Sequence, residues 1–299
     1  MSKSCIVTGA SGFVGQRLVN KLLENKYKVY AISRKSIEIQ NSLLVQINID
    51  CVDISSIRNY IEEDSIDYFY HFAWEGTSGI DRLNFDIQNR NLENACKSIV
   101  IASELNVKKF IFAGSIMEYE SLKEFNNTGM IGNTLYGFFK LITHKVTKTL
   151  AKELQIDYCS ICISNIYGPS DTSARFINEL IENVKSDKPM TLSSCMQNYD
   201  FIFIEDAVSG IILIAEKGKD GEEYYLGTEE NRILKDYVIC VKNILNEKYF
   251  LNFGSSTPSV SLEQDDIEKE KIFRELNFEI KVTFEEGIKK CVNNRGNNS

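Results

Sequence analysis

Short apolar segments alternate with longer amphipathic segments along the first two thirds of the chain. The apolar segments are rich in β-branched and aromatic residues, and they predict strands at 4–8, 28–32, 44–49, 68–73, 109–113 and 158–163. The amphipathic segments between them predict helices at 12–25, 55–63, 90–105 and 136–154. This alternation is typical of a parallel sheet with helices on both faces, so the pattern predicts a doubly wound α/β fold.

The pattern loosens beyond residue 166. A single strand is predicted at 199–204, among helices predicted at 174–184, 206–216, 235–246, 263–276 and 284–293. We therefore predict a first domain over 1–166 and a smaller α/β domain over 167–299, with some segments returning to the first domain. The chain holds only three prolines and no low-complexity linker, so the domains should pack together. The Asn-rich end, 293–299, is expected to fray.

Composition excludes several classes of protein. With 34 basic and 42 acidic residues the net charge is −8, which argues against general binding of nucleic acid or anionic membranes. No apolar run approaches the about 18 to 20 residues that span a bilayer, and the N-terminus carries no signal-peptide pattern. We therefore expect a cytoplasmic protein with small-molecule ligands.

The cysteines and histidines suggest neither a disulfide scaffold nor a catalytic metal. The eight cysteines are scattered, and Cys159 and Cys162 lie in a predicted strand that points them to opposite faces. His71 and His144 are the only histidines, and we interpret His71 as a core residue and His144 as a packing or helix-surface residue. We therefore expect a reduced protein without a metal.

A glycine motif, Thr8–Gly15, lies between the first predicted strand and the first helix. Glycines at this spacing permit a tight turn, close approach of a pyrophosphate and close helix packing, while the helix N-terminus attracts phosphate. A purely structural turn is the alternative, but the strand–turn–helix context favours a Rossmann-type dinucleotide site. The cofactor contacts predicted from this motif are Gly9, Ser11, Gly12, Phe13, Val14 and Gly15.

The end of the second predicted strand favours NADP(H) over NAD(H). NAD-binding folds place an acidic residue there, whereas this chain has Ser33, Arg34 and Lys35, with Arg34 nineteen residues after Gly15. A guanidinium suits a 2′-phosphate, although the basic pair could also be solvated loop charges. Asp50 and Cys51, after the third strand, are predicted to contact the adenine.

Tyr136 and Lys140 share one face of a predicted helix. An ammonium group beside a phenol lowers the pKa of the phenol, which suits a proton donor or acceptor near neutral pH. Such a pair alone would be interpreted as a surface feature. The glycine motif and Ser115 favour a catalytic role instead.

With the glycine motif, Ser115 and the Tyr136–Lys140 pair, the chain resembles the extended short-chain dehydrogenase/reductase family of NAD(P)-dependent nucleotide-sugar epimerases, dehydratases and reductases. The resemblance covers nearly the whole chain. The motifs that carry it are Thr8–Gly15, His71–Trp74, Asn91, Gly114–Tyr119, Tyr136–Lys140, Asn165–Pro169, Asp200–Asp206 and Phe278–Gly287.

The resemblance implies a role for each matching position. Tyr136 would be the acid/base, Lys140 would hold the nicotinamide ribose and tune Tyr136, and Ser115 would hydrogen-bond the reacting oxygen. It implies further cofactor contacts from Phe72, Ala73, Trp74 and Asn91, and an approach of Asn165 to the substrate diphosphate. It also implies a homodimer that pairs the Tyr136 helix and the helix at 90–105 with their copies.

Three departures from the family pattern narrow the function. The 4,6-dehydratases carry Asp-Glu directly after the Ser/Thr, whereas Ile116 and Met117 stand here and cannot move a proton. That disfavours dehydration, and a substitution by Glu118 would require a strand shift. Tyr199 stands where the family commonly has an arginine that binds the substrate phosphates. Arg175 or Arg232 could compensate for that loss, or each could simply be a solvated surface charge.

The third departure is the segment 74–79, in which Trp74, Glu75 and Thr77 would form one wall of the sugar pocket. An ordinary polar loop is the alternative. The segment resembles nucleotide-sugar 4-ketoreductases that build deoxysugars for surface polysaccharides. We count Ile116, Met117 and Tyr199 among the residues near the substrate.

The predicted function is NADPH-dependent reduction of a nucleotide-linked 4-keto(-6-deoxy) sugar. The alternatives are a 4-epimerase or dehydrogenase that retains NAD(H), and a non-catalytic protein that senses NADP. Arg34 favours the reductase, since a net reduction draws on NADPH. The presence of Ser115, Tyr136 and Lys140 together argues against a sensor.

Overall fold

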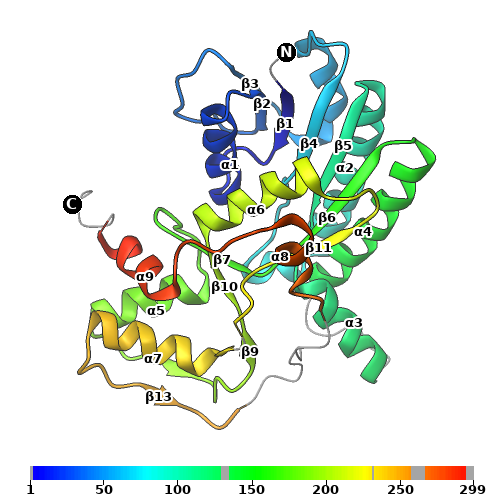
Figure 1. The fold of residues 1–299 in the computed structure, drawn as a ribbon. Coiled ribbons are helices and arrows are strands. Elements are labelled where there is room, and N and C mark those ends of the chain that lie inside the picture. Colours follow the sequence, from blue (N-terminus) through cyan, green and yellow to red (C-terminus); the bar gives the residue numbers. More distant parts are fainter. Residues whose placement is uncertain (1–2, 129–134, 231, 257–266, 294–299) are drawn as a thin grey trace.

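The computed structural model describes residues 3–128, 135–230, 232–256 and 267–293 (Figure 1). At its centre lies a seven-stranded parallel sheet in the order β11-β6-β5-β4-β1-β2-β3. The strands are β1 (Ser4–Thr8), β2 (Lys28–Ser33), β3 (Leu44–Asn48), β4 (Ile66–His71), β5 (Val107–Ala113), β6 (Asp157–Ile163) and β11 (Glu223–Leu226). The strand order reverses between β1 and β4, which is where doubly wound sheets bind their ligands.

Helices cover both faces of this sheet, and the predicted Rossmann-type fold is confirmed (Figure 1). On one face α1 (Phe13–Glu24) packs against α6 (Ile204–Lys217), and on the other α2 (Phe85–Glu104) packs against α4 (Leu135–Glu153). Alternate residues of β1 supply the two cores, because side chains alternate along a strand. Cys5 and Val7 join the α1 and α6 core, whereas Ile6 joins the α2 core.

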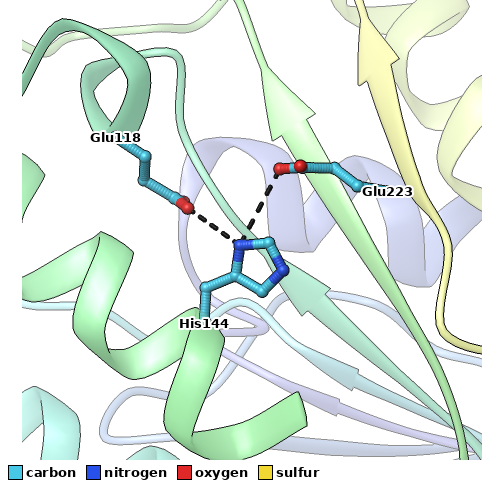
Figure 2. Close-up of side chains that lie close together, drawn as sticks. All are labelled: Glu118, His144 and Glu223. Atoms are coloured by element: carbon cyan, nitrogen blue, oxygen red, sulfur yellow. Dashed lines mark hydrogen bonds and ion pairs between the residues drawn. The ribbon is translucent and has the colours of Figure 1, made fainter. Parts of the chain in front are cut away.

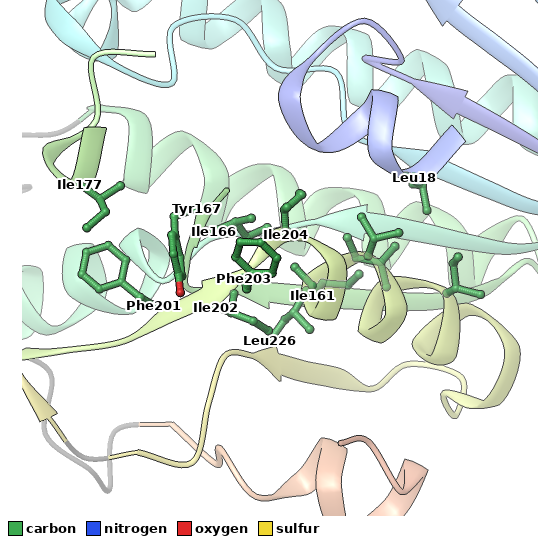
Figure 3. Close-up of a cluster of buried hydrophobic side chains, with 14 of the residues drawn as sticks. Leu18, Ile161, Ile166, Tyr167, Ile177, Phe201, Ile202, Phe203, Ile204 and Leu226 are labelled. Carbon is green, nitrogen blue, oxygen red and sulfur yellow. The ribbon is translucent and has the colours of Figure 1, made fainter. Parts of the chain in front are cut away.

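The smaller second part of the chain is built from short strand pairs and helices. Its strands are β7 (Asn165–Tyr167) with β10 (Phe201–Phe203), β9 (Asn198–Tyr199) with β12 (Arg232–Ile233), and β8 (Thr191–Leu192) with β13 (Asn252–Phe253). Its helices are α5 (Phe176–Lys185), α7 (Leu234–Leu245), α8 (Lys271–Leu276) and α9 (Phe284–Asn293). Tyr167, Phe201 and Phe203 pack beside Ile161 and Leu226 of the sheet, so one apolar core runs through both parts (Figure 3).

Several elements differ from the sequence prediction. Helix α2 begins at Phe85, five residues before the predicted start, because the side chain of Asn84 accepts a hydrogen bond from Ile87 N and caps it. The predicted helix at 55–63 is a 3₁₀ helix over Cys51–Tyr60. Residue 204 begins α6 instead of ending a strand.

Other elements had no counterpart in the prediction. Helix α3 (Met117–Thr128) was missed because its apolar Leu122 and Phe125 are exposed, which conceals the helical period. The sheet strand β11 is only four residues long. The predicted helix at 263–276 reduces to α8, while 257–266 and the predicted frayed residues 294–299 lie outside the described residues.

The remaining general expectations concern membranes and thiols. Within the part of the chain that the structure describes, each helix is either too short or too polar to cross a lipid bilayer. All eight cysteines are free thiols, and Cys159 and Cys162 belong to different apolar clusters.

Candidate active site

The glycine motif forms a turn that leaves no room for side chains. Gly9 has a φ of 71°, and a Cβ there would lie 2.8 Å from the carbonyl carbon of Phe72. A Cβ on Gly15 would lie 2.1 Å from the carbonyl oxygen of Gly9, so α1 packs directly on the turn. Gly12 N donates to Gly9 O at 3.0 Å, and α1 begins at the next residue. Such a turn fits a dinucleotide pyrophosphate.

A pocket opens beside this turn, over the carboxyl ends of β1, β2, β3 and β4. It is lined by residues predicted to bind the cofactor, namely Gly9, Ser11, Gly12, Ser33, Arg34, Asp50, Cys51, Phe72, Ala73, Trp74 and Asn91. Glu75, predicted to contact the substrate, also lines it, as do Ile32, Ile49 and Asn94, which were not predicted. Phe13, Val14 and Gly15 lie in the first turn of α1.

The basic residues at the pocket rim have partners. Arg34 Nη1 lies 3.5 Å from Glu75 Oε1, and both side chains are exposed. Glu75 Oε2 lies 4.0 Å from Arg90 Nη2, so the carboxylate is shared by two guanidinium groups. Ser33 Oγ donates to the exposed Lys35 at its carbonyl oxygen, 2.6 Å away. A phosphate group that bound Arg34 would therefore have to displace Glu75 from this ion pair.

Ser115 and Tyr136 meet at the carboxyl end of β5. Ser115 is separated from the end of β5 by Gly114, and its Oγ accepts a hydrogen bond from Met117 N at 3.3 Å. Tyr136, in the first turn of α4, is buried and shares a hydrogen bond with the Ser115 side chain. Gly137 lets α4 approach α3, since a Cβ there would lie 2.4 Å from the carbonyl oxygen of Met117.

The groups that set the pKa of Tyr136 differ from the one expected from the sequence, which was Lys140. Burial raises the pKa of Tyr136, and the hydrogen bond with Ser115 and the charge of Arg82 oppose this rise. The ammonium of Lys140 donates instead to the carbonyl oxygen of Ala113, 2.7 Å away. Burial lowers the pKa of Lys140 to about 7, while the Glu118 carboxylate acts in the opposite direction.

Trp74 borders both catalytic candidates. Its ring centre lies 3.7 Å from Lys140 Nζ and meets the Tyr136 ring edge-on at 6.1 Å. Its Nε1 donates to Gln88 Oε1 at 2.9 Å, and Gln88 Nε2 donates to the carbonyl oxygens of Gly76 and Asp81. Gln88 therefore shapes the loop after β4.

The sequence interpretation missed Gln88 because α2 was expected to start at residue 90. The sequence feature that could have identified Gln88 is its position one helical turn before Asn91, on the same helix face. Asn91 exchanges two hydrogen bonds with the backbone of Glu75, at 2.8 and 3.0 Å. Exposed Thr77 lies in the loop that these two amides hold.

Arg82 was also missed, because the short 3₁₀ helix that carries it, η2 (Gly79–Leu83), has no periodic pattern in the sequence. Its guanidinium carbon lies 4.9 Å from the centre of the Tyr136 ring. Its Nε is buried without a hydrogen-bond partner among the described residues. Burial raises the pKa of nearby Glu120 to about 6, against the opposing charge of Arg82. The result is a cationic group aimed at the acid/base candidate.

Tyr199, Asn165 and Arg175 lie together on the side of the second part of the chain. Tyr199 OH donates to Asn165 Oδ1 at 3.1 Å, and burial raises the pKa of Tyr199 to about 12. The charges of Arg82 and Arg175 both act on Tyr199. Arg175 donates to the carbonyl oxygen of Ile166 and lies 5.8 Å from the Phe13 ring. Arg175 is thus between the glycine turn and Tyr199.

Other predicted substrate residues are engaged elsewhere. Arg232 Nη1 lies 3.4 Å from both Glu230 and Glu285, and its guanidinium stacks on Tyr237 at 4.3 Å. Ile116 packs against the apolar cluster of Cys162, Tyr225 and Ile267. Met117 is half-buried at the first position of α3.

A largely buried polar cluster contacts the backbone of Ser115 through Glu118, and its three side chains are drawn in Figure 2. It consists of Glu118 from α3, His144 from α4 and Glu223 from β11. His144 is a buried packing residue, as one of the two sequence interpretations had it, and not a helix-surface residue. Its Nδ1 also lies 3.0 Å from Glu118 Oε2, a contact that the sequence interpretation did not include. The sequence showed no pattern that would join three elements so far apart along the chain.

Comparison with known proteins extends these observations. Residues 5–227 match the family model described as the NAD dependent epimerase/dehydratase family. The chain is 27% identical to the CDP-abequose synthase of Salmonella typhimurium over 80% of each chain. It is 23% identical to human dTDP-D-glucose 4,6-dehydratase over 97% of this chain and 89% of the other.

Solved structures agree on the fold. The UDP-glucuronic acid 4-epimerase of Bacillus cereus, in complex with UDP-glucuronic acid and NAD, superposes with a TM-score of 0.80. It is 21% identical and covers 99% of this chain and 100% of its own. The resemblance seen in the sequence is thereby confirmed, and this chain belongs to the NAD-dependent epimerase/dehydratase family of enzymes, which act on nucleotide sugars with NAD(P).

Proposed function

We propose that this chain reduces the ketone of a nucleotide-linked 4-keto sugar with NADPH, and that the product serves the synthesis of surface polysaccharides. The observation that carries the proposal is the meeting of Ser115 and Tyr136 next to Lys140, beside a pocket over the glycine turn. The CDP-abequose synthase relative makes a CDP-linked 4-keto-6-deoxy sugar the first substrate to test.

The residues after Ser115 support reduction over dehydration. Ile116 packs into an apolar cluster and Met117 carries a thioether, so neither side chain can remove a proton. Glu118, the next carboxylate, is buried and bonded to His144. It lies behind Ser115, with both oxygens engaged, and is therefore unavailable to the substrate.

The proposed reaction divides the work between cofactor and protein. When bound, NADPH supplies the hydride, which adds to the ketone carbon. Tyr136 donates its phenolic proton to the ketone oxygen as the carbon–oxygen double bond becomes a single bond, and solvent then reprotonates the phenolate. Ser115 hydrogen-bonds the same oxygen, and the charges of Lys140 and Arg82 stabilise the phenolate.

The substrate would lie between the glycine turn and the second part of the chain, residues 167–299. Arg82, Arg175 and Tyr199 converge on this side of Tyr136. Two guanidinium groups suit the diphosphate of a nucleotide sugar. We propose that Arg82 and Arg175 take the role of the family arginine that Tyr199 replaces.

Arg34 supports NADPH as the reductant, although the epimerase structure cited above holds NAD. Arg34 lines the pocket rim and pairs with an exposed carboxylate, which a 2′-phosphate can displace. Arg34→Ser should weaken NADPH binding about tenfold or more and leave NADH binding unchanged. Equal affinities of the wild-type protein for NADPH and NADH would contradict the choice of NADPH as the reductant.

A substrate screen tests the proposed function. CDP-, dTDP-, UDP- and GDP-linked 4-keto-6-deoxy sugars are supplied with NADPH, and loss of its near-ultraviolet absorbance is followed. The main rival is a 4-epimerase, which oxidises and re-reduces the same carbon with a retained cofactor. Stoichiometric NAD(H) that copurifies, and turnover that needs no added NADPH, would favour the epimerase.

Two broader expectations accompany the proposal. We propose a cytoplasmic location, which the eight free thiols support because they suit a reducing compartment. We also propose a homodimer through α2 and α4, each of which exposes apolar side chains such as Val100 and Val146. Sedimentation equilibrium tests the dimer.

A further inference from the structure

Glu118 ties the catalytic serine to the helix that carries the other catalytic residues. Its side chain is 3% exposed, and its Oε1 accepts a hydrogen bond from Ser115 N at 2.8 Å. Its Oε2 lies 3.0 Å from Nδ1 of His144 on α4 (Figure 2). A carboxylate can only accept, so His144 Nδ1 carries the proton of this bond.

A third element completes the cluster. Glu223 Oε1, from β11, lies 3.8 Å from the same Nδ1, and Glu223 Oε2 accepts a hydrogen bond from Tyr119 OH at 2.8 Å. The His144 ring stacks between Phe112 and Tyr158, with ring centres 5.9 and 6.2 Å away. Because its ring is buried and packs against two aromatic rings, His144 gives Glu118 a fixed partner.

The three side chains are better explained as a structural network than as a metal site. Both Glu118 oxygens already accept protein hydrogen bonds, and Nδ1 is already a donor. Nε2, the ring nitrogen that keeps a free lone pair, points away from both carboxylates in Figure 2.

The position of Glu118 affects Ser115 and Lys140 differently. A Cβ on Gly114 would lie 2.6 Å from Glu118 Oε1, so the carboxylate packs directly on the turn that presents Ser115. Its negative charge also favours the ammonium form of Lys140, which burial opposes. The carboxylate thus acts on both residues without facing the cofactor pocket.

We propose that Glu118 is a positioning residue that orients Ser115 through its backbone, with His144 holding the carboxylate in place. A charge link from Glu118 to Lys140 accompanies this role. The inference rests on the proposed function for its kinetic consequence. The link between Glu118 and Lys140 can be measured without turnover.

Several titratable groups face these two side chains from the surrounding elements. Around Glu118 they are Tyr119 on α3, Tyr136, Lys140 and His144 on α4, Tyr158 and Cys162 on β6, and Glu223 on β11. Around Lys140 they are Glu118 and His71, the latter on β4. Of these, Glu118 is the carboxylate that acts on Lys140.

Glu118→Gln tests the charge while preserving the shape. The amide oxygen can still accept from Ser115 N, so we expect a correctly folded enzyme. The alkaline limb of its pH profile should move down by about one unit, so kcat above pH 7 should fall about tenfold with KM little changed. Glu222→Gln, which neutralises an exposed carboxylate paired with Lys271, is the matched control and should leave both unchanged.

Glu118→Asp tests the positioning separately. It keeps the charge but withdraws the carboxylate from Ser115, so kcat should fall while the pH profile stays in place. If Glu118→Gln failed to fold, wild-type kcat in Glu118→Asp would still overturn the positioning role. Wild-type kcat and pH profile in Glu118→Gln would overturn the charge link, and wild-type kcat in both variants would overturn the proposal as a whole.

A titration of Lys140 separates this proposal from the proposed function. The protein is labelled with ¹³C at lysine Cε, and the Lys140 signal is identified by its loss in Lys140→Met. We expect a midpoint near 7 in the wild type and a lower one in Glu118→Gln. An unchanged midpoint overturns the charge link, whereas failure of the wild type to reduce any nucleotide sugar overturns only the proposed function.

Discussion

The ammonium nitrogen of Lys140 lies 3.7 Å from the centre of the Trp74 ring, so an indole covers one side of a buried charge. A cation over an aromatic face regains part of the hydration energy that burial removes. The remaining cost appears in the pKa of Lys140, which burial lowers to about 7. Because burial changes the pKa of Lys140 on folding, it affects the stability of the protein as well as catalysis.

The stability of the protein should depend on pH through Lys140. Between pH 7 and 10.5 the unfolded chain holds a proton on Lys140 that the folded chain has released. Stability therefore rises with pH across this window, by at most about 1.4 kcal/mol per unit. Lys140→Met should remove this contribution, as urea unfolding at several pH values would measure. Lys145→Met, on the exposed side of α4, is the control, and a constant difference between wild type and Lys140→Met would contradict the assignment.

Tyr136→Phe should abolish turnover while preserving cofactor binding. The change removes the only hydroxyl of the side chain, which shares a hydrogen bond with Ser115, and leaves the ring that packs against Trp74. We expect a loss of about 10²- to 10⁴-fold in kcat. Fluorescence titration with NADPH provides the binding control. Activity that survives the change would show that another group transfers the proton.

Arg82→Gln should weaken the use of the sugar nucleotide more than the use of the cofactor. The change removes a charge that lowers the pKa of Tyr136 and of Glu120, so both pKa values should rise. Loss of one charged hydrogen bond predicts a fall in kcat/KM of about tenfold to a hundredfold. Initial rates would measure it, with Arg58→Gln, at an exposed arginine paired with Glu104, as the control. A matching loss of NADPH affinity would place Arg82 in the cofactor site instead.

Gln88→Leu should destabilise the protein through the loop after β4. The side chain of Gln88 is fully buried and serves the indole of Trp74 and the carbonyl oxygens of Gly76 and Asp81. Its removal takes one hydrogen-bond partner from each of these three groups, of which the Asp81 carbonyl oxygen still accepts from Asn84 N, and this should cost about 2 to 4 kcal/mol. Urea unfolding measures this cost, and the exposed Gln16 offers the control Gln16→Leu. Equal stability of the two variants would indicate that water replaces the amide.

Much of the candidate site could be predicted because its residues occur in local patterns. The glycine turn is a short motif, and Tyr136 and Lys140 are neighbours on one helix face. Arg82 and Glu118 show no such pattern, and the position of Gln88 one turn before Asn91 does not by itself reveal its role. Each acquires its role from a partner on another element: Tyr136 for Arg82, Trp74 for Gln88 and His144 for Glu118.

The sequence by itself determined the alternation of strands and helices, because apolar residues at a period of two or 3.6 select a sheet or helix face locally. It also determined the glycine turn, since only glycine tolerates the close approach at positions 9 and 15. Only the tertiary structure decided that the short strand β11 completes the sheet and brings Glu223 to His144. The tertiary structure also decided the pKa of Lys140, because burial and the distances to Trp74 and Glu118 depend on packing between segments far apart along the chain.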